Sequence, residues 1–243
     1  MERGIKLKRY VFLVFVIGLI VAVSGCTMSG WGSGNLTNQT KEVNGVNQVL
    51  LNGIGTIILQ QGDQESLTIE AEDNILPHIQ SKVEGNKLII SYDTNTPTPT
   101  KDVKFYLTVK DMTSIGISGA GKIQSTGFNT KTMSITMDGA GDGNLAGLTL
   151  EKLTVNISGA GKMIMAGKAT EQTVTISGAG NYEANDLATE ITTINVDGAG
   201  KGTVNVSKVL NAMINGAGNL NYLGSPQVNQ QINGGGSVKQ VTN

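Results

Sequence analysis

Cys26 is the residue whose type and position most directly predict covalent chemistry. It is the single cysteine of the 243-residue chain. A basic segment, an apolar segment and small residues precede it in the order that is typical of a bacterial lipoprotein signal. These are Arg3, Lys6, Lys8 and Arg9, then residues 10–23, then Ser24 and Gly25. We therefore predict that residues 1–25 are a signal peptide and that the sulfur of Cys26 carries a palmitate-type lipid.

Two other interpretations of this N-terminus stay open. A plain secretory signal followed by an incidental cysteine would have the same basic and apolar segments. A membrane-spanning anchor would need roughly 20 apolar residues, and the apolar segment 10–23 is shorter than that. In all three cases a single cysteine cannot form an intramolecular disulfide, so the fold must be stabilised by its core.

Two aspartates, Asp138 and Asp142, are the candidate metal ligands. They stand in the segment Asp-Gly-Ala-Gly-Asp-Gly, which resembles the glycine and aspartate turns that bind calcium. Calcium sites of repeat proteins use aspartates in successive repeats, whereas this pattern occurs in one repeat here. The sequence therefore predicts no cofactor and no metal site. Asp138 and Asp142 are the two residues that would be tested first as calcium ligands.

The carboxylates and the single histidine do not predict an active site. Asp138 and Asp197 hold equivalent positions three repeats apart, which is about 14 Å at a strand spacing of roughly 4.8 Å. Paired carboxylates of glycosidases lie roughly 5 to 9.5 Å apart. His78 is the only histidine and follows Pro77, where we expect an exposed side chain. We therefore predict no catalytic residue and no enzyme activity.

A tripeptide repeat determines the elements that carry these side chains. Gly-Ala-Gly recurs at intervals of 18–20 residues and is followed by Gly-Gly-Gly from Gly234, a period that indicates stacked repeats. The glycines are Gly119, Gly121, Gly139, Gly141, Gly159, Gly161, Gly178, Gly180, Gly198, Gly200, Gly216 and Gly218. We expect them at turns that require a positive φ or a close approach of neighbouring coils.

The residues around these glycines alternate between apolar and polar, the pattern of a half-buried strand. The residue two positions before each repeat is apolar throughout: Ile117, Met137, Ile157, Ile176, Val196, Ile214 and Ile232. A unit of this size cannot bury its own apolar side, so each coil must stack on the next. We predict an all-β fold, a single-stranded parallel β-helix with coils of about 18–20 residues. An arrangement of antiparallel hairpins is the alternative.

The chain divides into four parts by composition. We predict a signal peptide over 1–25, a flexible tether rich in Gly, Ser, Asn and Thr over 26–44, a β-rich section over 45–111 and the repeat β-helix over 112–240. One inward column weakens to Ala212 and Gln230 in the last repeats. Because the end of a β-helix is an open sheet edge, we expect modest self-association or a partner at the C-terminal end.

The charge balance excludes one class of partner. The full chain has 18 basic and 19 acidic residues, and loss of residues 1–25 leaves 14 lysines, 18 acidic residues and no arginine. Nucleic-acid binding needs a basic surface, so we do not expect it. Aromatic residues make up 4% of the chain, which also argues against a sugar platform built on ring stacking.

A set of short motifs before and within the repeats resembles a known family. They are Gly62-Asp63, Leu67-Thr68-Ile69, Asn74-Ile75-Leu76, Val83-Glu84-Gly85 and Leu88-Ile89-Ile90, followed by repeated Ser-Gly-Ala-Gly blocks. Over residues 45–238 the sequence is similar to the bacterial head GIN domain family of autotransporter-adhesin-like proteins. The resemblance implies a right-handed β-helix and an envelope or surface protein.

Together these features predict a lipid-anchored, non-catalytic protein of the bacterial cell envelope that serves as an adhesin or a scaffold. We expect it in the outer membrane, bound through its N-terminal lipid, with an envelope or extracellular glycan or protein as its partner. A carbohydrate-binding or carbohydrate-active envelope protein is the alternative, because the long faces of a β-helix suit a polysaccharide.

Overall fold

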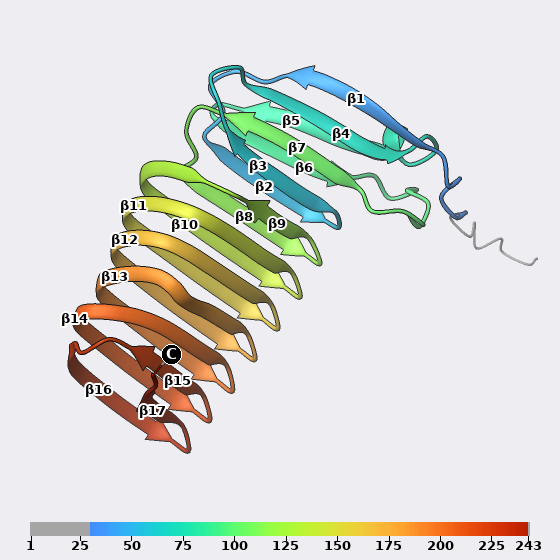
Figure 1. The fold of residues 1–243 in the computed structure, drawn as a ribbon. Helices are drawn as coiled ribbons and strands as arrows, with labels where there is room; N and C mark the ends of the chain where they lie inside the picture. The colour runs from blue at the N-terminus through green and yellow to red at the C-terminus, as the bar shows by residue number, and fades with distance from the viewer. Residues whose placement is uncertain (1–29, 243) are drawn as a thin grey trace, which may run out of the picture.

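The computed structural model describes residues 30–242, so the predicted signal peptide and Cys26 lie outside the described residues. A parallel β-solenoid makes up most of the described chain, and antiparallel strands cover its N-terminal end (Figure 1). The predicted all-β solenoid is therefore confirmed. Among the described residues the helical element is the short 3-10 turn η1 (Leu76–His78). No helix in this part of the chain is long and apolar enough to cross a membrane.

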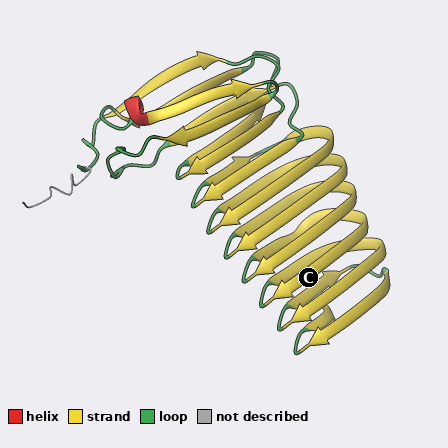
Figure 2. Cartoon of the chain, turned by 180° about the vertical axis from the view of Figure 1, so that it is seen from behind, coloured by secondary structure: helices red, strands yellow, loops and turns green. Residues whose placement is uncertain are grey.

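The solenoid strands stack in register along the repeat. They are β8 (Ser114–Gly119), β9 (Lys122–Ser125), β10 (Phe128–Gly139), β11 (Asp142–Gly159), β12 (Lys162–Gly178), β13 (Asn181–Gly198), β14 (Lys201–Gly216), β15 (Asn219–Leu223), β16 (Gln227–Gly234) and β17 (Ser237–Gln240). All of their pairings are parallel, and the first glycines of the repeats align in one column from Gly119 to Gly234. Figure 2 shows the corner turns at one edge of the stack.

Each full coil has three segments of alternating burial, as β11 illustrates. The inward side chains are Leu145 in the first segment, Leu148 and Leu150 in the second, and Leu153, Val155 and Ile157 in the third. Pairs of residues that are not buried, 146–147 and 151–152, separate the segments, so the two-residue period restarts at each bend. Gly147 supplies the first bend with a φ of +64°.

Two faces of the solenoid meet at the Gly-Ala-Gly corner. We call the segments that run into the corner the pre-corner face: 114–118, 134–138, 154–158, 173–177, 193–197, 211–215 and 229–233. The post-corner face starts after the corner and consists of β9, the first residues of β11–β14, β15 and β17. The predicted apolar column beneath the pre-corner face is buried from Ile117 to Ile214, whereas Ile232 in the last coil is 38% exposed.

The N-terminal cap is built from seven strands, two of which continue the solenoid. The strands are β1 (Leu36–Glu42), β2 (Gln48–Gly53), β3 (Thr56–Gln61), β4 (Ser66–Glu72), β5 (Ile79–Glu84), β6 (Lys87–Tyr92) and β7 (Lys104–Val109). β2 and β3 form the first coil, because Gly53 aligns with Gly119 and Thr56 with Lys122. β6 and β7 lie parallel on their other side, and β5, β4 and β1 complete the cap in antiparallel order.

The expected flexible tether over 26–44 is wrong where the structure describes it. Leu36–Glu42 forms β1, which pairs along its whole length with β4. The sequence of β1 is polar because six of its seven residues are exposed at the edge of the cap. Composition therefore indicated a loop, and pairing with a distant strand overrode that preference.

Ser125 is a polar residue in an apolar column, aligned between Leu59 and Leu145. Its side chain is buried, and its hydroxyl makes no hydrogen bond within residues 30–242. Burying an unpaired hydroxyl costs about 1–3 kcal/mol. We expect Ser125→Ala to raise the free energy of unfolding by about 1 kcal/mol in urea denaturation. Ser118→Ala, at an exposed position, is the control, and equal effects of both variants would contradict the prediction.

Candidate functional site

The corner turns hold adjacent coils together through the backbone. Gly198 has a φ of +121°, and a Cβ there would lie 2.6 Å from the carbonyl oxygen of Gly178. The N–H of Ala199 donates to that same oxygen at 2.9 Å, and the N–H of Lys201 donates to the carbonyl of Gly180 at 2.9 Å. The same pair of contacts recurs at the other Gly-Ala-Gly corners. These glycines therefore act in packing, and the alanines between them are exposed.

The candidate calcium ligands lie on opposite sides of one corner. Asp138 ends the pre-corner segment of β10, and Asp142 begins the post-corner segment of β11. Both side chains are exposed, and in the part of the chain that the structure describes no group of three or more His, Cys, Asp or Glu residues could hold a metal ion. Asp197 aligns with Asp138 through two intervening serines, Ser158 and Ser177, which keeps these carboxylates three coils apart.

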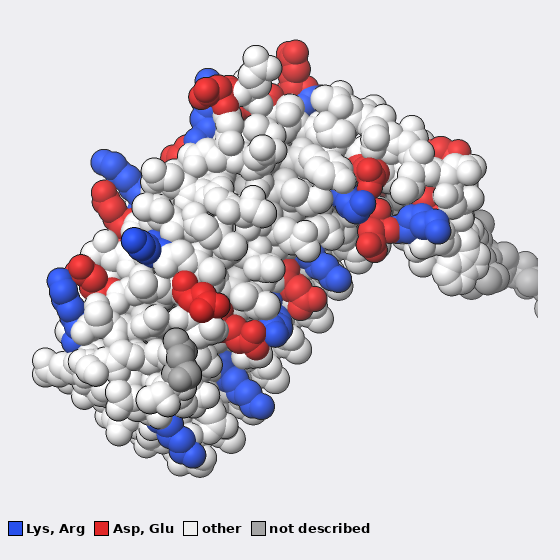
Figure 3. Space-filling view, in the orientation of Figure 1, with Lys and Arg blue, Asp and Glu red and all other residues white. Residues whose placement is uncertain are grey.

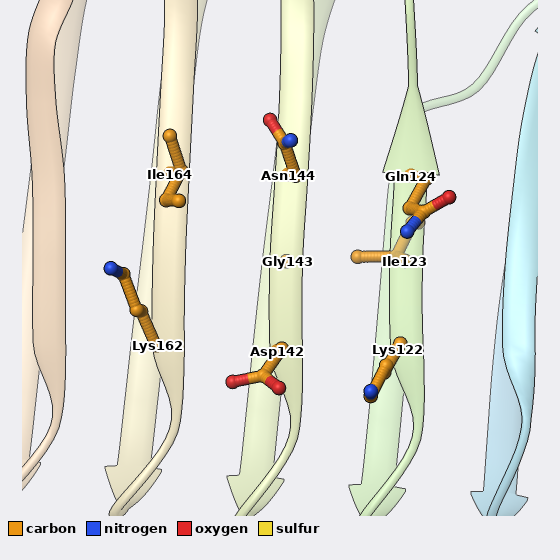
Figure 4. A pocket seen from close by; sticks show the side chains of 8 residues that line it. All are labelled: Lys122, Ile123, Gln124, Asp142, Gly143, Asn144, Lys162 and Ile164. Atoms are coloured by element: carbon orange, nitrogen blue, oxygen red, sulfur yellow. The ribbon is translucent and has the colours of Figure 1, made fainter.

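One column of aligned residues on the post-corner face, beside the corner, contains four charged side chains. The aligned residues are Lys122, Asp142, Lys162, Asn181, Lys201, Asn219 and Ser237. In Figure 4, Asp142 lies between Lys122 and Lys162 at the edge of a hollow that Gln124, Asn144 and Ile164 also line. Unlike charges are neighbours, and Lys162 pairs with Glu183 at 2.9 Å. Blue and red groups accordingly alternate along this edge in Figure 3. We interpret the column as a solvated ladder.

The pre-corner face differs from the post-corner face, because hydroxyl and amide groups occupy most of its outward positions. They are Ser114, Ser118, Ser134, Thr136, Thr154, Asn156, Ser158, Thr173, Thr175, Ser177, Thr193, Asn195, Asn211, Asn215, Asn229, Gln231 and Asn233. Asp138 and Asp197 are the charged residues within these segments. The face repeats one kind of polar group at the spacing of the coils, roughly 4.8 Å.

The middle and the last coils of this face differ in how many of their side chains are hydrogen-bonded to one another. In the last coils the amide side chains bond along the stack: Asn215 donates to the carboxylate of Asp197 at 2.7 Å, and Asn233 donates to the amide oxygen of Asn215 at 2.9 Å. In the middle coils, side chains such as Thr136, Thr154 and Thr175 make no side-chain hydrogen bond within residues 30–242. These hydroxyl groups are therefore free to bond to a ligand or to water.

His78 is not the exposed residue that the sequence predicted. Its ring is partly buried, and Nδ1 lies 2.9 Å from Asp93 Oδ2. The hydrogen bond with His78 is the main cause that lowers the pKa of Asp93. Asp93 also accepts the N–H of Asn95 at 3.0 Å, and the hydroxyl of Thr96 donates to its backbone carbonyl at 2.8 Å. The pair therefore holds the loop between β6 and β7, a contact that local sequence could not indicate.

Glu72 is a buried carboxylate that the sequence analysis missed. It ends β4 and is 1% exposed. Its oxygens accept the N–H of Gly34 at 2.7 Å, the N–H of Thr100 at 2.8 Å, the N–H of Lys101 at 3.3 Å and the hydroxyl of Thr100. One side chain thus joins the N-terminal segment to the loop before β7. We call this set of contacts the Glu72 clamp.

The Glu72 clamp predicts a pH-dependent N-terminus. Burial raises the pKa of Glu72, but the hydrogen bonds from Thr100, Gly34 and Lys101 outweigh it and lower the pKa from 4.5 to about 2. The contribution of the clamp is therefore complete above pH 4.5 and is lost as the pH falls from 4.5 toward 2. We expect the protection factors of the amides of residues 30–36, which compare the observed exchange with the intrinsic rate at each pH, to fall in that range.

Glu72→Gln tests this explanation. The variant should show low protection factors over residues 30–36 at neutral pH and little further change in them in acid, because the ionised clamp is already missing. Glu42→Gln, an exposed position on β1, should behave like the parent chain. A parent-like pH profile in Glu72→Gln would show that another group controls this segment.

A known protein family matches most of the chain. Residues 46–226 match the model of a family described as "Putative auto-transporter adhesin, head GIN domain". The chain belongs to this head GIN domain family. The match begins at Val46, just before β2, and covers the solenoid as far as β15 and every cap strand except β1, so the resemblance found in the sequence is confirmed. No curated protein matches the chain.

Solved structures with the same architecture come from bacteria. A crystal structure from Bacteroides fragilis, described as a "putative adhesin", is 27% identical, covers 87% of this chain and 99% of its own, and superimposes with a TM-score of 0.82. Two structures from Parabacteroides distasonis cover the same shares of each chain: one described as a "putative adhesin" (21% identity, TM-score 0.66) and one as a "putative lipid binding protein" (20% identity, TM-score 0.69). These two share the fold alone. Membership of the head GIN domain family indicates an adhesin-like protein of the cell envelope or surface.

Proposed function

We propose that this head GIN domain protein is a non-catalytic adhesin, anchored in the outer membrane through a lipid on Cys26, that binds its partner through the pre-corner face. The observation that carries the proposal is the array of uncharged hydroxyl and amide groups on that face, whose middle coils leave their hydroxyls without side-chain partners. Such an array can make many weak, equivalent hydrogen bonds to an extended or repetitive partner.

The side of the membrane decides between an adhesin and an internal scaffold. Ala160→Cys introduces a thiol at an exposed corner position. If Cys26 is acylated, its sulfur cannot react. The thiol introduced at position 160 is then the one that a membrane-impermeant maleimide can label. Labelling of intact cells supports the adhesin, whereas labelling only after permeabilisation overturns it and favours a scaffold within the envelope. The parent chain is the control, because it should stay unlabelled in both conditions.

The binding face is tested by adding charge at its centre. Thr175→Lys and Asn156→Lys place a cation among the uncharged groups of neighbouring coils. We expect cells that carry either variant to lose most of their adhesion to surfaces coated with glycan or protein. Thr203→Lys, an outward position on the post-corner face, is the matched control. Equal adhesion by all three variants would exclude the pre-corner face.

Carbohydrate binding is the second candidate, and the regular hydroxyl array favours it. A polysaccharide presents repeated hydroxyl groups that could bond to successive coils. We expect the purified chain to co-sediment with insoluble polysaccharide, with peptidoglycan sacculi as the envelope probe. Loss of sedimentation in Thr175→Lys, but not in Thr203→Lys, would identify the adhesin's ligand as a glycan. Equal sedimentation of both variants would count against this candidate.

We further propose that the last coil mediates self-association. β16 and β17 pair on one side only, with β14 and β15, so they end the stack as open edges within the described chain. Ile232 is 38% exposed there. Open edges of this kind pair with other chains unless they are blocked. A strict monomer at high concentration in light scattering would contradict the proposal.

A further inference from the structure

Two large apolar side chains are exposed where the described chain begins. Trp31 is 71% exposed and Leu36 is 52% exposed, the two highest values among the large hydrophobic residues that the structure describes. Trp31 is also the only tryptophan of the chain. An exposed indole carries a large apolar area and a polar N–H, which is the combination that favours the interface between a membrane and water.

The backbone around Trp31 is held on both sides, so the ring is presented from a fixed position. Trp31 forms a β-bridge with Thr98, and the N–H of Gly32 donates to the carbonyl of Thr98 at 2.9 Å. On the other side, the side chain of Asn74 donates to the carbonyl of Trp31 at 3.0 Å. The Glu72 clamp holds Gly34 three residues further on. The exposure of Trp31 is therefore a property of the folded cap.

The position of Trp31 in the chain limits its distance from Cys26. The two residues are five positions apart, and a fully extended chain spans at most about 3.6 Å per residue. The Cα atoms of Cys26 and Trp31 can therefore be no more than about 18 Å apart. A flexible tether over 26–44 would have let the folded cap lie much further from Cys26, whereas the described structure, with Trp31 held on the cap, already begins at residue 30.

We propose that Trp31, with Leu36 beside the same edge of the cap, inserts into the membrane interface next to the lipid-bearing Cys26. The inference rests on the proposed lipid anchor. It defines an orientation: the cap faces the membrane, and the solenoid extends away from it. In Figure 1 the chain enters at the cap, at the opposite end of the molecule from the C-terminal coils.

Electrostatics around this edge do not favour an anionic surface. Asp73, which accepts the hydroxyl of Ser33, and Lys101 are both exposed near the N-terminal segment, so the region carries charges of both signs. The insertion therefore depends on the apolar side chains and should occur in membranes of zwitterionic lipid. It should also depend only weakly on salt, because burial of apolar side chains, and not attraction to charged lipid, drives it.

The experiment uses the single cysteine and the single tryptophan of the chain. The chain from Cys26, which contains the entire described fold, is coupled through Cys26 to a maleimide-bearing phospholipid in phosphatidylcholine vesicles. We expect Trp31 emission to shift to shorter wavelength on coupling and to lose most of its intensity when the acyl chains are brominated. Unchanged emission and no quenching would overturn the proposal.

A second probe position tests the orientation. In the double variant Trp31→Phe and Met213→Trp, the tryptophan lies on the pre-corner face six coils from Leu50, which is roughly 29 Å at the strand spacing. Met213 is 39% exposed, so the probe is accessible. We expect no shift and no quenching at this position. Quenching at both positions would show that the chain lies flat on the vesicle and would contradict the orientation.

This design separates the contact from the anchor. Chemical coupling provides a lipid at Cys26 whether or not cells attach one, so failure of quenching counts against the Trp31 contact alone. The mass of the N-terminal peptide from cells tests the anchor independently. An unmodified Cys26 there would overturn the proposed anchor and, with it, the membrane contact in the cell.

Discussion

Gly198→Ala should destabilise the solenoid by about 3 kcal/mol or more. Alanine at a φ of +121° costs roughly 1–2 kcal/mol in backbone conformation. Its Cβ would also lie 2.6 Å from the backbone oxygen of Gly178, which can move only if the neighbouring coil moves. For a domain of this size the loss corresponds to a fall in Tm of about 6–12 °C, measurable by circular dichroism.

Matched variants separate the corner geometry from a general effect of substitution. Ala199→Gly changes the adjacent, exposed residue of the same turn and should cost less than about 1 kcal/mol. Gly235→Ala adds a methyl group where no atom lies within 4 Å, so it should also be tolerated. If Gly198→Ala were as stable as these two variants, the corner glycines would not be required for stacking.

Tyr182→Phe should cost about 1–3 kcal/mol, because it leaves a buried acceptor without its donor. The hydroxyl of Tyr182 donates to Gln172 Oε1 at 2.8 Å, and Gln172 Nε2 donates to the hydroxyl of Thr192 at 2.9 Å. Thr189 and Thr192 share a further hydrogen bond of 2.9 Å. All four side chains are buried in the solenoid core, and burial raises the pKa of Tyr182. Urea denaturation measures the loss.

Two further variants test whether the hydrogen bond causes the effect. Tyr222→Phe removes a hydroxyl that makes no hydrogen bond within residues 30–242, and it should change stability by less than about 0.5 kcal/mol. The double variant Tyr182→Phe and Gln172→Leu replaces both partners by apolar groups, and we expect it to recover part of the loss. A double variant that loses the sum of both single effects would contradict a shared hydrogen bond.

The hydrogen bonds of Tyr182 and Gln172 also determine which coil stacks on which. The apolar columns beneath the pre-corner face contain isoleucine, valine or methionine in nearly every coil, so they would pack in more than one register. Gln172, Tyr182, Thr189 and Thr192 can satisfy their hydrogen bonds only with β12 beside β13 in the observed register. A satisfied polar network of this kind specifies one stacking arrangement, and apolar burial supplies most of the stability.

Local sequence was sufficient for the repeats and insufficient for the first coil. The Gly-Ala-Gly corners follow from a period that recurs in the chain, and each coil repeats the same alternation. Gly53 stands in the same column as Gly119, but isoleucine replaces alanine in its turn, Asn52-Gly53-Ile54-Gly55, and a cap insertion of about 50 residues follows. The predicted β-rich section over 45–111 therefore includes the first coil of the solenoid.

The amino-acid sequence by itself determined the solenoid, its family and the polar character of its outer faces, because these depend on spacings within one or two coils. Only the tertiary structure decided the cap: that β1 is a strand, that Glu72 clamps Gly34 to Thr100, that His78 meets Asp93 and that Trp31 is held exposed. The physical reason is the range of the contacts. A stack of similar coils repeats one short-range pattern. The cap depends on single pairings between residues far apart in the chain, such as Trp31 and Thr98, which are 67 positions apart, and no periodicity in the sequence indicates these pairings.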